Sequence, residues 1–76
     1  MDWRRLQQRL ETEEGREGLS TAISRKLIKD RVLDCDAVQI AAHVAGGLGD
    51  AYGIVAYDVI LKAASLAGVP VVDRGR

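Results

Sequence analysis

The chain has 76 residues, and its 11 basic and 11 acidic side chains give a formal net charge of zero. This neutral balance argues against a general nucleic-acid or membrane binder, because such proteins usually carry a clear basic excess. Residues 1–76 are enough for one small domain with a narrow stability margin, and a composition with 47% hydrophobic but only 4% aromatic residues requires a core of Ala, Val, Ile and Leu.

The single cysteine, Cys35, excludes an intramolecular disulfide and fits a reducing compartment. The N-terminal segment MDWRRLQQRLE lacks the apolar region of a signal peptide. Glycines and charged residues interrupt every apolar stretch before it reaches membrane-spanning length. We therefore expect a complete, small cytoplasmic protein without a membrane segment.

The first predicted helix covers residues 2–13, within an N-terminal element that ends by residue 14, and Asp2 is its expected N-cap. Its arginines lie at the positive end of the helix dipole and its glutamates at the negative end, so this helix should depend on docking. The docking side is a narrow apolar stripe with i, i+3, i+7 spacing: Trp3, Leu6 and Leu10.

The polar segment EGREG at 14–18 contains two glycines and predicts a turn. The second helix then runs from Leu19 or Ser20 to about Lys29 and ends or kinks within residues 30–34, where its apolar pattern fails. Its apolar face is expected to contain Leu19, Ala22, Ile23 and Leu27.

The third helix is predicted at 37–45. Asp36 followed by Gln39 resembles a capping box, which marks a helix start, and the pair Gly46-Gly47 predicts the end. Apolar residues cover most of this helix, so it should be buried on more than one side.

The central helix is predicted from Asp50 to Ala67, with Gly68 as the C-terminal cap residue and Pro70 preventing continuation. After its first turn the polar side chains other than the tyrosine hydroxyls form one thin stripe of Asp58, Lys62 and Ser65. Residues 54–61 are also rich in β-branched and aromatic types, which leaves a strand as the alternative.

The tail at 69–76 is expected to be extended, with VPVV as a short strand or hydrophobic strap and a mobile DRGR end. Together the elements predict an all-α fold, a small bundle of three to four short helices. Its centre is the helical hairpin formed by the third helix and the central helix.

No motif in the sequence predicts chemistry or a cofactor. GGLGDAYG lacks the lysine of a P-loop and the third glycine of a dinucleotide-binding loop. Cys35 and His43 are too few for a structural zinc site, and nucleophilic catalysis would need a pocket that so short a chain can hardly build. We expect a protein that is not an enzyme and holds no metal.

A helix-turn-helix nucleic-acid-binding regulator is the alternative function. The third helix, the glycine turn and the central helix have suitable lengths, but residues 50–58 offer two aspartates and no base-reading side chain. Phosphate contacts would fall to a basic group that otherwise forms a solvated helix face: Arg25, Lys26, Lys29 and Arg31.

The favoured function is protein–protein interaction, in which a small regulatory or inhibitory protein occludes a partner surface. The third and central helices are apolar over most of their circumference, whereas the first two helices each offer one narrow stripe. This shortage of cover predicts a homodimer through the outer side of the hairpin, near Tyr52, Tyr57, Ile60 and Leu61.

Overall fold

The computed structural model describes residues 2–72, with the side chain of Asp50 left out. This part of the chain forms four α-helices and one short 3₁₀ helix. They are α1 (Trp3–Glu11), α2 (Glu13–Lys29), α3 (Ala37–Leu48), η1 (Asp50–Tyr52) and α4 (Gly53–Ala67). Since residues 54–61 lie within α4, the helical prediction for that stretch is confirmed and the strand alternative is wrong.

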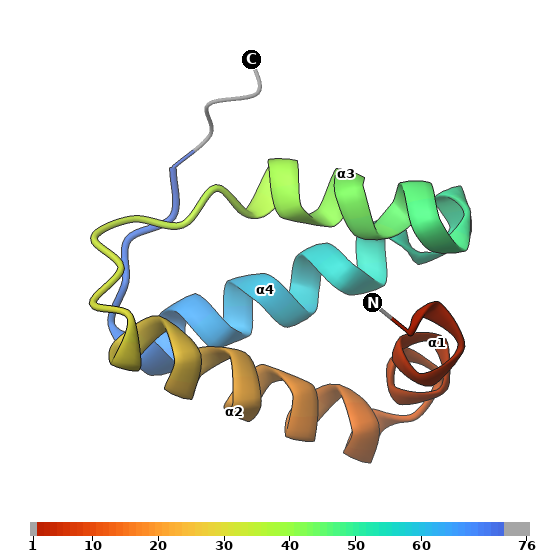
Figure 1. Ribbon diagram of the computed structural model, residues 1–76, viewed down its shortest axis with the longest axis horizontal. Coiled ribbons are helices and arrows are strands. Elements are labelled where there is room, and N and C mark those ends of the chain that lie inside the picture. Colours follow the sequence, from red (N-terminus) through yellow and green to blue (C-terminus); the bar gives the residue numbers. More distant parts are fainter. Residues whose placement is uncertain (1, 73–76) are drawn as a thin grey trace.

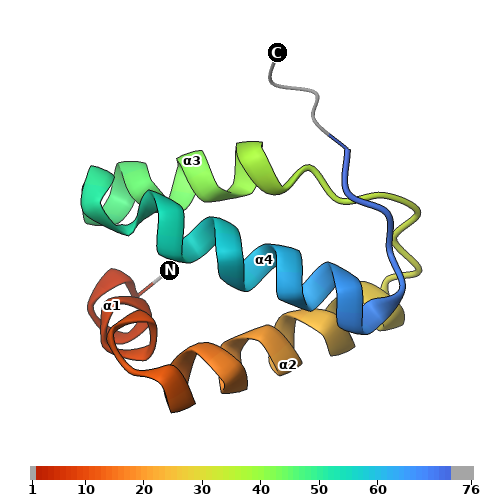
Figure 2. The same cartoon turned by 180° about the vertical axis from the view of Figure 1, so that it is seen from behind.

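Helix α4 lies between α2 and α3, and the three helices form a single layer (Figures 1 and 2). α3 runs antiparallel to α4, while α2 runs in the same direction as α4, and α1 crosses the end of the layer where α4 begins. The molecule measures 29 × 29 × 19 Å, and its shortest dimension lies across this layer. The predicted all-α bundle with a central α3–α4 hairpin is confirmed.

The corner between α1 and α2 is at Thr12, so the predicted turn at 14–18 is wrong. Thr12 is the N-cap of α2, and its hydroxyl accepts a hydrogen bond from the Gly15 amide at 3.0 Å. Glu13 in the first turn suits the positive end of the helix dipole. A side chain at Gly15 would collide with the Arg9 carbonyl, so the glycine permits the sharp corner while remaining helical.

The most deeply buried residues of α2 are serines, while the predicted face residues Leu19 and Ile23 pack partly buried against the core. Ser20 is 1% exposed, and its hydroxyl lies 2.9 Å from the Arg16 carbonyl oxygen and 3.3 Å from the Val59 carbonyl oxygen of α4, sharing its one proton between them. Ser24 is also buried. Such a contact between a side chain and the neighbouring backbone means that α2 and α4 approach closely. Ala22, predicted to face the core, is exposed instead.

Helix α2 ends at Lys29 as predicted, with Asp30 as its C-cap, and Arg31 adopts a left-handed conformation with φ 52°. Helix α3 begins as predicted, because the Asp36 carboxylate accepts a hydrogen bond from the Gln39 amide at 3.0 Å. It extends to Leu48, beyond the predicted end at residue 45, since both glycines there remain helical.

Helix α4 begins at Gly53 rather than at Asp50, because η1 first turns the chain. Its C-terminal end is as predicted: Gly68 is left-handed, and its amide donates to carbonyl oxygens of the last turn. The polar stripe predicted on this helix is exposed to solvent at Asp58, Lys62 and Ser65. The buried arc on the other side of α4 consists of Ala56, Val59, Ile60, Ala63 and Ala64.

The segment after α4 is the predicted strap. The Cys35 amide donates to the Pro70 carbonyl at 3.0 Å, and the Val72 amide donates to the Cys35 carbonyl at 2.9 Å. These bonds form a parallel bridge between Cys35 and Val71 that ties the strap to the loop before α3. The end predicted to be mobile, residues 73–76, lies outside the described residues.

Trp3 anchors α1 to α3. Its ring lies where a side chain at Gly47 would project, so only a glycine leaves room for the indole. The Trp3 ring also contacts the His43 ring, with centroids 5.8 Å apart and planes inclined at 57°. Helix α1 therefore docks through its apolar stripe as predicted, and Gly47 of α3 provides the space for the Trp3 ring.

We predict that Gly47→Ala destabilises the protein by about 1–3 kcal/mol, because the new methyl group displaces the Trp3 ring. Gly46→Ala is the matched control: nothing lies near its added methyl group, so higher helix propensity should stabilise the protein by about 0.5–1 kcal/mol. Urea unfolding followed by fluorescence of the single tryptophan measures both changes. Equal stabilisation by both substitutions would show that Trp3 does not dock on Gly47.

Candidate functional site

An apolar depression between α3 and α4, here called the outer groove, has a volume of about 230 Å³. Ile54 projects beside it with 77% of its surface exposed. Among the described residues that line the groove none is charged, and the Tyr57 side chain supplies the only side-chain polar group. Its principal lining residues are Val38, Ala42, Ala45, Gly53, Ile54 and Tyr57.

The predicted interface residues do not form one surface. Tyr57 lines the outer groove, and Leu61 is half-buried one helical turn further along α4. Ile60 is only 3% exposed and packs in the core, so its assignment to an interface is wrong: it belongs to the buried arc of α4. Tyr52 is half-buried, and its hydroxyl is bonded to residues of α1.

Tyr52 links η1 to α1 through a small polar network. Its hydroxyl donates to the Glu11 carboxylate at 2.9 Å and accepts from the Gln7 amide nitrogen at 3.0 Å. The hydrogen bond to Glu11, together with desolvation, raises the pKa of the Tyr52 phenol. Tyr52 therefore has a structural role in holding α1 against the start of the α4 segment.

The predicted basic group occupies the C-terminal end of α2 and the turn that follows. All four side chains are exposed to solvent, and the Lys26 ammonium group lies 3.4 Å from the Asp30 carboxylate. The members are Arg25, Lys26, Lys29 and Arg31.

Helix α4 is the candidate recognition helix of the alternative function. A DNA major groove, about 12 Å wide, admits a single helix. Helices α2 and α3 flank α4 in the view of Figure 1. Helix α4 itself contains no Arg, Asn or Gln, and its exposed charged side chains are Asp58 and Lys62.

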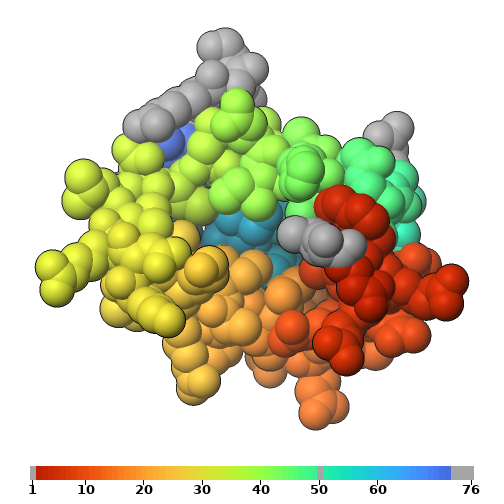
Figure 3. Space-filling view, viewed as in Figure 1, coloured from red at the N-terminus to blue at the C-terminus, as the bar shows by residue number. Residues whose placement is uncertain are grey.

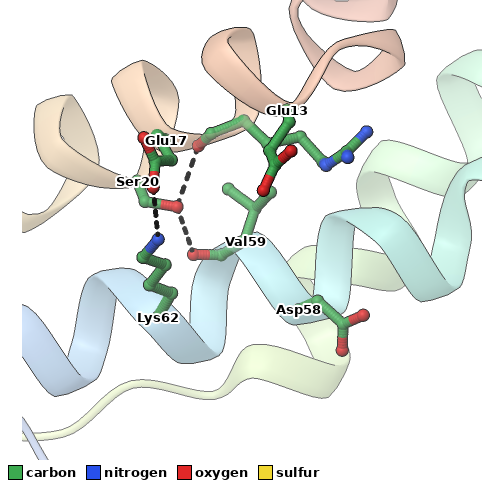
Figure 4. A pocket seen from close by; sticks show the side chains of 7 residues that line it. Glu13, Glu17, Ser20, Asp58, Val59 and Lys62 are labelled. Carbon is green, nitrogen blue, oxygen red and sulfur yellow. Dashed lines mark hydrogen bonds and ion pairs between the residues drawn. The ribbon is translucent and has the colours of Figure 1, made fainter.

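A charged depression lies between α2 and α4 (Figure 4). The Lys62 ammonium group pairs with the Glu17 carboxylate at 3.4 Å, and the Arg16 guanidinium donates to the Leu10 carbonyl at 2.9 Å. Beneath these groups the Ser20 hydroxyl contacts the backbones of both helices. The two basic side chains of this depression are thus engaged in holding helices together.

Cys35 and His43 occupy different environments. Cys35 is 3% exposed, and burial, with the neighbouring Asp36 and Asp34 carboxylates, raises the pKa of its thiol. His43 is exposed on α3, and its ring makes a tilted contact with the ring of Trp3. Within residues 2–72, no cluster of three or more His, Cys, Asp or Glu side chains is arranged to hold a metal ion.

Apart from Tyr57, the residues of the outer groove were not predicted, although they belong to two further apolar stripes. On α3, Val38, Ala42 and Ala45 follow i, i+4, i+7 spacing. On α4, Ile54, Tyr57 and Leu61 follow i, i+3, i+7 spacing. Each stripe lies beside the buried one, and the sequence pattern by itself does not say which of the two faces another helix.

No protein-family model, no curated protein and no solved structure matches this chain. In the part of the chain that the structure describes, no helix is both long enough and apolar enough to traverse a lipid bilayer.

We predict that Cys35 makes stability depend on alkaline pH. Its folded-state pKa lies above the ordinary value of 9.0, so the protonated thiol favours the folded state below that pH. As the pH rises above 9.0, the thiol ionises first in the unfolded chain and stability falls. Urea unfolding at about pH 8 and about pH 10 should show a larger loss for the native sequence than for Cys35→Ala. Equal losses would mean that the thiol is solvated.

Proposed function

We propose that the protein is a non-enzymatic binding module that acts by occupying a protein surface, in a regulatory or inhibitory role, and that it self-associates. The observation that carries this proposal is the outer groove. There an exposed aliphatic side chain, Ile54, lies beside a hollow whose described lining residues are mostly small and uncharged. Apolar surfaces on two adjacent helices are typical of protein interaction sites.

The first partner we propose is a second copy of the chain. The outer groove contains both a projecting side chain, Ile54, and a hollow formed by Ala42, Ala45 and Gly53. In a twofold symmetric dimer the same patch is used by both subunits, so each Ile54 can enter the hollow of the other subunit. The absence of charge in the lining leaves no like-charge pair at the centre of such a contact.

The outer groove by itself is smaller than a stable protein–protein interface, so we expect weak association. Stable interfaces bury about 800 Å² on each partner, a large share of the 5324 Å² of accessible surface. The contact must therefore extend beyond the groove, towards Leu61 on α4. We expect a reversible dimer that dissociates on dilution, which leaves the same face free for another protein.

We predict that Ile54→Glu weakens self-association by about tenfold or more, because it places a charge at the centre of the apolar contact. Ile28→Glu is the matched control, since Ile28 is also an exposed isoleucine of a helix but lies on α2. Sedimentation equilibrium at rising concentration measures association of all three proteins.

Two results would contradict the proposal. One is a monomer at high micromolar concentration for the native sequence, and the other is equal weakening by both substitutions. Salt-dependent binding to duplex DNA that is lost in Arg25→Glu and Lys29→Glu would instead favour a nucleic-acid-binding regulator acting through the basic group.

A further inference from the structure

A second apolar depression, here called the central hollow, lies on the other side of α3 from the outer groove. It measures about 210 Å³ and is lined by all four α-helices, and every lining side chain is aliphatic. Figure 3 shows α4 at the bottom of this hollow, with α3, α2 and α1 around it. Principal lining residues are Leu6, Leu10, Ile23, Ile40, Val44 and Ala56.

The walls of the central hollow are fixed by contacts outside it. Helices α2 and α3 pack on opposite sides of α4, which holds them apart (Figures 1 and 2). Helix α1 closes one end and is anchored by Trp3 on Gly47 and by the Tyr52 hydroxyl on Glu11. On α4 the small side chain of Ala56 leaves the space unfilled. The hollow therefore results from the contacts that fix the positions of the four helices.

We infer that the central hollow binds small, neutral, apolar molecules, of the size of one aromatic ring or a short branched hydrocarbon. A charged or hydrogen-bonding ligand would lose its water contacts without gaining a polar partner from the lining. An apolar ligand meets no such cost, and an apolar protein cavity of about 150 Å³ is large enough to take benzene. Ile40, 43% exposed at the rim, marks the route of entry.

This site is distinct from the proposed protein-binding surface. Ile40 and Val44 lie on one side of α3, whereas Val38 and Ala42 lie on the other and line the outer groove. The central hollow also uses α1 and α2, which contribute nothing to the lining of the outer groove. Substitutions on α3 can therefore test the two surfaces separately.

Toluene titrated into the isotope-labelled full chain is the test, with amide chemical shifts as the readout. We expect saturable shifts for residues around the central hollow. Ala56→Leu should fill the space, raise the melting temperature and abolish the shifts. Ile40→Asp, which puts a charge at the rim, should weaken toluene binding by about tenfold or more. Val38→Asp is its control on the same helix, with a similar exposure of 36%, and should bind toluene like the native sequence.

Three outcomes would overturn the inference. One is an absence of saturable shifts in the native protein, and another is unchanged toluene binding by a folded Ala56→Leu variant. A loss of binding in Val38→Asp but not in Ile40→Asp would place toluene in the outer groove. If Ala56→Leu does not fold, the comparison of Ile40→Asp with Val38→Asp decides the question.

Discussion

The close approach of α2 to α4 at Ser20 is the contact on which the rest of the structure depends. The Ser20 hydroxyl lies 3.3 Å from a backbone oxygen of α4, a separation that only a small side chain on α2 permits. On the opposite side α3 packs against α4, and the buried residues of α3 include the small side chains of Ala37 and Ala41. Because both neighbours can lie so near, the buried arc of α4 is covered in a chain that has no phenylalanine.

Other small residues of α3 and α4 create the two apolar depressions of the molecule. Alanine and glycine allow helix backbones to approach but fill little volume, so space remains wherever two or three helices diverge. The outer groove lies where Ala42 and Ala45 meet the start of α4, and the central hollow lies above Ala56. Both are apolar because α3 and α4 carry few polar residues. The binding surfaces proposed above thus follow from how the core is built.

Helix α1 owes its position to side chains that lie far away in the sequence. The charged side chains of α1 lie at the unfavourable ends of its dipole, as the sequence indicates. The helix is nevertheless capped by Asp2, and its Trp3 ring packs on Gly47 of α3. The network of Gln7, Glu11 and Tyr52 adds a second point of attachment. Since α1 closes one end of the central hollow, these contacts also determine the shape of that site.

The sequence by itself determined the helical class, the N-caps at Asp2 and Asp36, the end of α2 and the Gly68 cap, because each depends on neighbours within a few residues. It also predicted a short strand or strap after Gly68, but the hydrogen bonds that hold this segment join it to Cys35, far away in the sequence. The start of α2 was predicted wrongly, because the glycines at 15 and 18 suggested a turn. The residue that marks the start is the N-cap Thr12. The sequence pattern also placed Ile60 at a surface. The tertiary structure alone decided which stripe of α3 and α4 is buried, because both helices are apolar on several sides. The contact of Ser20 with the α4 backbone and the burial of alanines on α3 and α4 mark the stripe that forms the core. The other stripe, which includes Ile54, remains exposed.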